Sequence, residues 1–124
     1  MQNAALTLGR KGEDFAADHI DRVLGWRVLA RNWRCRAGEV DLVAIDGDTL
    51  VVVEVKTRGT TRAGHPLESI TVKKVENLRR LALTFLVQCR EDLDLPYFAH
   101  VRIDAIGILW NGGRPKLTHV RNVG

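Results

Sequence analysis

The chain has 124 residues, of which 45% are hydrophobic and 27% charged, and it carries a net charge of +4. This length and composition are typical of one compact globular domain, here residues 1–124. No apolar run reaches the roughly 18 residues that a membrane helix needs, and the N-terminus lacks the layout of a secretion signal. We therefore expect a cytoplasmic protein with no membrane partner, in which Cys35 and Cys89 are reduced thiols.

The first element is a helix over residues 8–24. Its apolar stripe consists of Ala16, Ile20, Val23 and Leu24. Gly25 follows and is well placed to end the helix. Glu13 precedes Ile20 by nearly two helical turns, so it is expected to point along the buried stripe.

Three strands are expected next, over residues 26–34, 38–45 and 50–57, with the turn "DGDT" between the second and the third. A polar loop, 58–66, leads to a second helix over 71–88 that Thr71 can cap. The segment 97–110 is predicted to be a fourth strand, and a short strand near "KLTHV" follows Pro115, which favours a sheet edge. The order indicates an α/β fold in which a mixed central sheet is flanked by helices.

Two carboxylates interrupt strands that otherwise look buried. Alternation puts Glu54 and Lys56 on one face of the third strand. If Ile45 pairs with Leu50, Asp41 lies directly across from Glu54, and we favour this register because it matches apolar residues. A two-residue Asp46-Gly47 loop would instead pair Glu39 with Glu54, and a three-residue loop would turn Asp41 to the other face.

Carboxylates that face each other across a hairpin have Cβ atoms about 4.5–5.5 Å apart, so they repel one another. A divalent cation removes this conflict, and Mg²⁺ (or Mn²⁺) suits a site with few carboxylates. We expect Asp41, Glu54 and the Val55 carbonyl to hold the metal, and Lys56 to position the attacking water. Glu13 could hold a metal-bound water from the first helix.

Basic residues cluster around this pair of strands. The net positive charge suits a polyanion as partner. Solvated faces explain any one cluster, but three clusters beside one carboxylate site favour phosphate contacts. The proposed contacts with nucleic acid are Arg58, Lys73 and Lys74.

The blocks "GRKGEDFAADHI", "RNWRCRAGEVDLVAID", "VVVEVKTR" and "TVKKVENLRRLA" resemble, in this order, those of the YraN-like family of uncharacterised bacterial proteins. That family is similar to the PD-(D/E)XK nucleases and, among these, to the archaeal Holliday junction resolvases. The resemblance covers roughly residues 8–106 and implies a restriction-endonuclease-like αβββαβ core.

The resemblance also implies roles for individual residues. Asp41, Glu54 and Lys56 match the D, E and K of the nuclease motif, and Glu13 matches an acidic residue of the first helix. Lys74 matches a basic position at the start of the second helix. The chain departs from the motif at its proline, where Val40 stands.

The sequence thus predicts a metal-dependent endonuclease that hydrolyses phosphodiester bonds in DNA, with branched or flapped DNA as candidate substrates. Resolution of junctions would require two active sites and hence a homodimer. The alternative is a nucleic-acid-binding accessory module with a nuclease fold and little or no hydrolysis. A structural protein that binds another protein is less favoured, because it leaves the paired carboxylates unexplained.

Overall fold

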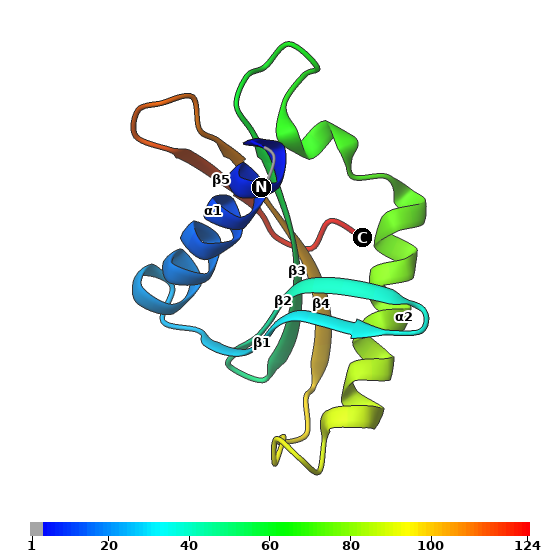
Figure 1. Ribbon diagram of the computed structural model, residues 1–124. Coiled ribbons are helices and arrows are strands. Elements are labelled where there is room, and N and C mark those ends of the chain that lie inside the picture. Colours follow the sequence, from blue (N-terminus) through cyan, green and yellow to red (C-terminus); the bar gives the residue numbers. More distant parts are fainter. Residues whose placement is uncertain (1–3) are drawn as a thin grey trace.

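The computed structural model describes residues 4–124, and their side chains from residue 7 on. The elements in chain order are α1 (Ala4–Asp18), η1 (His19–Val23), β1 (Arg27–Cys35), β2 (Gly38–Asp46), β3 (Thr49–Arg58), η2 (Pro66–Ser69), α2 (Val72–Cys89), β4 (His100–Leu109) and β5 (Lys116–Val120). The expected order of one helix, three strands, a helix and two strands is confirmed (Figure 1).

The end of the first helix differs from the expectation. Ala16 and Ile20 are fully buried, but Val23 is 69% exposed, so its place in the buried stripe was wrong. The reason is local geometry, because residues 19–23 form a π-helix. Its wider turn rotates later side chains away from the 3.6-residue stripe. Gly25 ends the helical segment as expected, with a φ of +70°.

The five strands form one mixed sheet in the order β1-β2-β3-β4-β5. Only β3 and β4 are parallel, and the chain between them passes through α2. Ile45 pairs with Leu50 and Asp46 with Thr49, which confirms the favoured hairpin register. Gly47, with a φ of +60°, lies in the two-residue turn that closes this hairpin.

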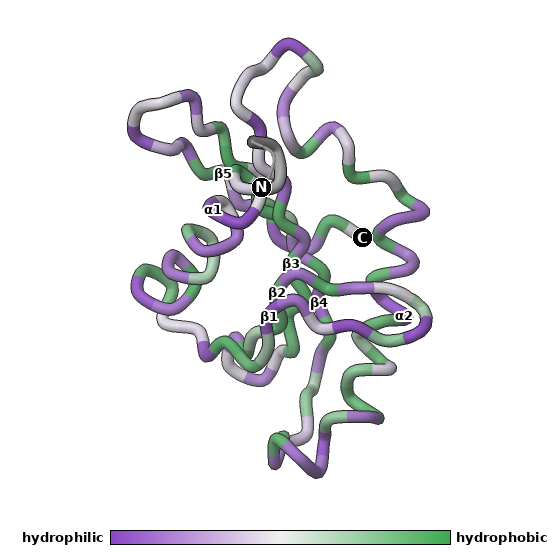
Figure 2. The backbone as a smooth tube through the Cα atoms, in the orientation of Figure 1, coloured by the Kyte–Doolittle hydropathy of each residue, from purple (hydrophilic) through white to green (hydrophobic). Residues whose placement is uncertain are grey.

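Helices cover both faces of the sheet (Figure 1). On one face, Val51, Val53 and Val55 pack with Ala16 of α1 and Ile20 of η1. On the other, Leu50 and Val52 pack with the apolar face of α2. Hydrophobic and hydrophilic residues alternate along α2 in Figure 2, as expected of a helix with one buried side. We refer to these as the α1 face and the α2 face.

The edge strand β5 is fixed by a buried carboxylate, Asp104, which sequence reasoning did not single out. Asp104 is fully buried and accepts hydrogen bonds from Arg102, from His119 and from the Asn122 backbone N–H. Burial raises the pKa of Asp104, but these bonds outweigh it and hold the pKa below its usual value. The cluster joins β4 to β5 and to the segment that follows it.

Two further expectations concern the whole described chain. Within residues 4–124, no helix is both long and apolar enough to span a lipid bilayer. Cys35 and Cys89 are free thiols, as expected.

Candidate metal and phosphodiester site

Asp41 lies where β2 separates from β3. The two strands pair from Asp46–Thr49 to Leu42–Val53, and no pair follows. Beyond this point β2 pairs only with β1, and Trp33 at the far end of that hairpin packs against Phe85 of α2 (ring centroids 5.3 Å apart). Figure 1 shows this hairpin crossing towards α2.

Beyond the last backbone pair, the Asp41 side chain supplies a hydrogen bond between β2 and β3. Asp41 Oδ2 accepts a hydrogen bond of 2.8 Å from the Val55 N–H. One further step of the β2–β3 register places Asp41 opposite Glu54, and the two carboxyl groups are in hydrogen-bonding contact. Glu54 is only 4% exposed, so the pair is poorly solvated.

Burial and the neighbouring Glu54 change the ionisation of Asp41. Burial is the main cause that raises the pKa of Asp41 to about 8, and contact with Glu54 adds to it. Asp41 therefore retains its proton at neutral pH. A divalent cation could replace that proton and remove the repulsion, so the donor set fits Mg²⁺ or Mn²⁺.

Replacing Asp41 by Asn should stabilise the protein in a pH-dependent way. Well below pH 3.8, Asp41 is protonated in both the folded and the unfolded chain and contributes nothing to the pH dependence of stability. Between pH 3.8 and about 8 the unfolded chain releases this proton while the folded chain keeps it, so wild-type stability falls as pH rises. We expect Asp41→Asn to be more stable than wild type by about 1–3 kcal/mol at pH 8.

The measurement is urea unfolding of both proteins at pH 4 and pH 8 without divalent cations. The difference in free energy of unfolding should be much smaller at pH 4 than at pH 8, because pH 4 lies close to the ordinary pKa of 3.8 and an Asn amide oxygen can still accept the Val55 N–H. Equal differences at the two pH values would show that Asp41 ionises normally in the folded protein.

Lys74, which the sequence suggests as a phosphate contact, lies beside the carboxylate pair in the structure. Its Nζ lies 3.2 Å from Glu54 Oε2, and its side chain is 42% exposed. The Thr71 hydroxyl accepts a hydrogen bond of 3.1 Å from the Lys74 N–H, so the helix cap fixes the position of the Lys74 backbone. Lys74 is thus the counter-ion of Glu54 in this structure.

Lys56 and Val55 occupy opposite faces of β3. Val55 packs on the α1 face and is 7% exposed, so only its backbone can contribute to the site. Lys56 is two residues beyond Glu54 on the α2 face and is partly exposed. Both are therefore compatible with their expected roles. Arg58, at the end of β3, is partly exposed, and Lys73 is exposed at the start of α2.

Glu13 approaches the carboxylate pair from α1. It is half-buried and lies close enough to Asp41 to contribute to the raised pKa of that residue. Burial, and to a smaller extent Glu39, raise the pKa of Glu13 itself, while a hydrogen bond with Asn32 opposes this. The helix can come this close because Gly12 lies directly on Thr57, where an added Cβ would be 1.8 Å from the Thr57 hydroxyl oxygen.

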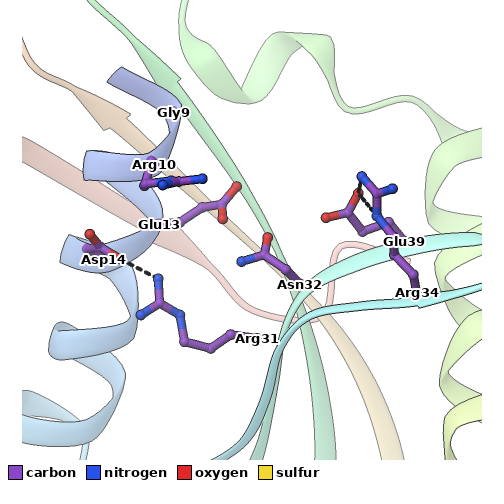
Figure 3. Close-up of a pocket in the computed structure, with 8 residues that line it drawn as sticks. All are labelled: Gly9, Arg10, Glu13, Asp14, Arg31, Asn32, Arg34 and Glu39. Carbon is purple, nitrogen blue, oxygen red and sulfur yellow. Dashed lines mark hydrogen bonds and ion pairs between the residues drawn. The ribbon is translucent and has the colours of Figure 1, made fainter. Parts of the chain in front are cut away.

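A cleft of about 580 Å³ separates α1 from the β1–β2 hairpin. Figure 3 shows Glu13 pointing across it towards Asn32 and Glu39. The cleft is lined by Gly9, Arg10, Glu13, Asp14, Arg31, Asn32, Arg34 and Glu39. Arg31 pairs with Asp14, and Arg34 pairs with Glu39 at 3.0 Å, so most of its charges are compensated.

Sequence reasoning missed Asn32, which has a φ of +51° and contacts Glu13. Asparagine tolerates the left-handed conformation better than most residues, but its position in a strand-like segment gave no sign of this. The described residues contain no group of three or more His, Cys, Asp or Glu side chains that could hold a metal. The protein would supply two carboxylates, so most of the ligand shell would come from water and substrate.

Sequence comparison with known proteins matches most of this chain. The pattern of the uncharacterised protein family UPF0102 matches residues 12–108. A UPF0102 protein of Arthrobacter sp. is 44% identical over 119 residues, which cover 94% of this chain and 95% of the relative. A UPF0102 protein of Acidothermus cellulolyticus is 48% identical over 112 residues, which cover 86% of this chain and 84% of the relative. One of Herpetosiphon aurantiacus is 42% identical over 123 residues, which cover 99% of this chain and 98% of the relative.

Proposed function

The chain belongs to the uncharacterised protein family UPF0102, as its resemblance to the YraN-like family predicted, and from its paired carboxylates we propose that it is a metal-dependent DNA endonuclease. The observation that carries this proposal is the contact between Asp41 and Glu54. Two poorly solvated carboxylates side by side destabilise the fold. A divalent cation would neutralise both of them and give the pair a function.

Each residue has a role in this proposal. Asp41, Glu54 and the Val55 carbonyl would hold Mg²⁺ or Mn²⁺, which when bound supplies Lewis-acid activation of water and phosphate. Lys56 would orient the attacking water from the same face as Glu54. Glu13 would hold a further water from α1. Arg58 and Lys73 would contact phosphates beside the site.

Lys74 would interact first with Glu54 and then with a substrate phosphate. Its ammonium group neutralises Glu54 at 3.2 Å, and the cation would compete with it for that carboxylate. Once released, the ammonium group can turn towards a substrate phosphate, as the sequence led us to expect. Branched or flapped DNA remains the proposed substrate class, and cutting two strands of a junction would require a homodimer.

The Lys74–Glu54 ion pair also favours a second candidate, a nucleic-acid-binding module with little or no hydrolysis. In such a module Lys74 would satisfy Glu54 permanently and no cation would bind. Calorimetric titration with Mn²⁺ separates the two candidates. Mn²⁺ binding that Asp41→Asn weakens by about tenfold or more supports the nuclease, and no binding by wild type supports the module.

Binding to DNA should depend steeply on salt in either case. We expect log K for a labelled four-way junction to fall linearly with log[salt], and replacing Arg58 or Lys73 by Ala should reduce the slope by about 0.9 each, because each removes one phosphate contact. Lys74→Ala should do so only when Ca²⁺ is present to displace Lys74 from Glu54.

Arg22→Ala is the matched control for this titration. Arg22 is an exposed arginine on η1, which packs on the α1 face through Ile20, and it pairs with Asp18 at 2.8 Å. It should leave the slope unchanged. Equal slopes for wild type, Arg58→Ala and Lys73→Ala would show that these residues do not contact phosphate.

A further inference from the structure

His65 lies at the end of the polar loop after β3, and its ring lies against β4 of the sheet. The short helix η2, which follows His65, packs against both β3 and β4. Gly107 of β4 lies beneath it, since a Cβ at Gly107 would be 2.8 Å from Leu67 Cγ and 3.2 Å from His65 Cε1. The absence of a side chain at this position therefore leaves the space that the imidazole and Leu67 occupy.

The position of Gly107 relates His65 to the carboxylate site. Gly107 pairs in register with Lys56, and two residues earlier on both strands Ala105 pairs with Glu54. Registered residues on neighbouring parallel strands point to the same face of a sheet. The His65 ring thus lies on the α2 face, which also carries Glu54, over the β4 position that pairs with Lys56.

One nitrogen of His65 is committed to the fold and the other is not. Nδ1 accepts a hydrogen bond of 3.1 Å from the Leu67 N–H and caps η2. The neutral ring must then carry its proton on Nε2. His65 is exposed, and within the part of the chain that the structure describes its Nε2 has no hydrogen-bond partner.

We propose that His65 is a substrate-binding residue whose Nε2–H donates a hydrogen bond to a phosphate oxygen of the nucleic-acid strand at the Asp41–Glu54 site. The inference rests on the proposed nuclease function and adds a neutral donor to it. The cap on Nδ1 fixes both the tautomer and the direction of the donor. A phosphate that lies next to Lys56 comes within reach of a group placed over Gly107.

The experiment separates the two nitrogens. His65→Asn keeps an acceptor where Nδ1 lies, so the cap of η2 is retained, but it removes the Nε2 donor. His65→Gln places an amide N–H near Nε2 and loses the cap. Binding of a fluorescein-labelled four-way DNA junction is measured by anisotropy in Ca²⁺ over a range of salt, with thermal unfolding of each protein alone.

His65→Asn should unfold at the wild-type temperature and bind about tenfold more weakly, as expected for a lost hydrogen bond to a charged group. The salt slope should not change, because a neutral donor releases no counterion. His65→Gln should regain part of the affinity. Gly107→Ala, which displaces the ring without altering it, should weaken binding to a similar extent.

Wild-type affinity in His65→Asn would overturn the inference and leave His65 as a cap only, while the proposed function would stand. A reduced salt slope in His65→Asn would also contradict it, since the ring would then act as a cation. Failure of wild-type protein to bind the junction in Ca²⁺ would instead refute the proposed function and the inference with it.

Discussion

Glu54→Gln should reduce Mg²⁺-dependent cleavage of a branched DNA substrate by at least about a hundredfold, the usual cost of removing a group that organises charge in a reaction. Asp41→Asn and Lys56→Ala should do the same. Glu54→Gln removes the carboxylate that Lys74 neutralises, but Lys74 is 42% exposed and can turn to solvent. The fold should therefore survive, and circular dichroism and thermal unfolding check this.

Glu76→Gln is the matched control for this prediction. Glu76 is exposed on α2, two residues from Lys74, so the same chemical change is made next to the site but outside it. It should cleave like wild type. If Glu54→Gln protein, purified in parallel, retained full cleavage, the proposed site would be wrong.

Cation affinity should distinguish Asp41 from Glu39, the two acids that the alternative hairpin registers place opposite Glu54. Because Ile45 pairs with Leu50, Asp41 is the one that contacts Glu54. Glu39 instead pairs with Arg34 on the hairpin. Asp41→Asn should weaken Mn²⁺ binding by about tenfold or more, and Glu39→Gln should change it by about twofold at most.

Lys74→Met should change Mn²⁺ affinity in the direction opposite to Asp41→Asn. If Lys74 competes with the cation for Glu54, its removal should tighten Mn²⁺ binding in calorimetry without DNA. A greater loss of affinity in Glu39→Gln than in Asp41→Asn would reverse the ligand assignment. Unchanged affinity in all three variants would place the cation elsewhere.

The hairpin was predictable because its register has a local cause. Pairing Ile45 with Leu50 matches apolar residues across a short turn, and one slipped residue would move Asp41 to the other face. The facing of Asp41 and Glu54 followed from that register alone. The cap at Thr71 was likewise predictable, since capping depends on neighbouring residues.

Features that depend on distant parts of the chain were not predictable in this way. The ion pair between Lys74 and Glu54 joins α2 to β3, and its geometry depends on how the helix docks. The π-helix that exposes Val23 leaves no signature in hydrophobic periodicity. Asp104 lies on a strand face that also carries Ile106 and Ile108, and this polar interruption was the available sign of a buried cluster.

The close approach of Gly12 to Thr57 links two positions that are far apart in the sequence. Any side chain at position 12 would meet the Thr57 hydroxyl, so a larger residue there requires a smaller one at position 57 or an outward shift of α1. An outward shift would carry Glu13 away from Asp41. Residues 12 and 57 are therefore not free to vary independently in a chain that keeps Glu13 at the site, and together they set the spacing between helix and sheet.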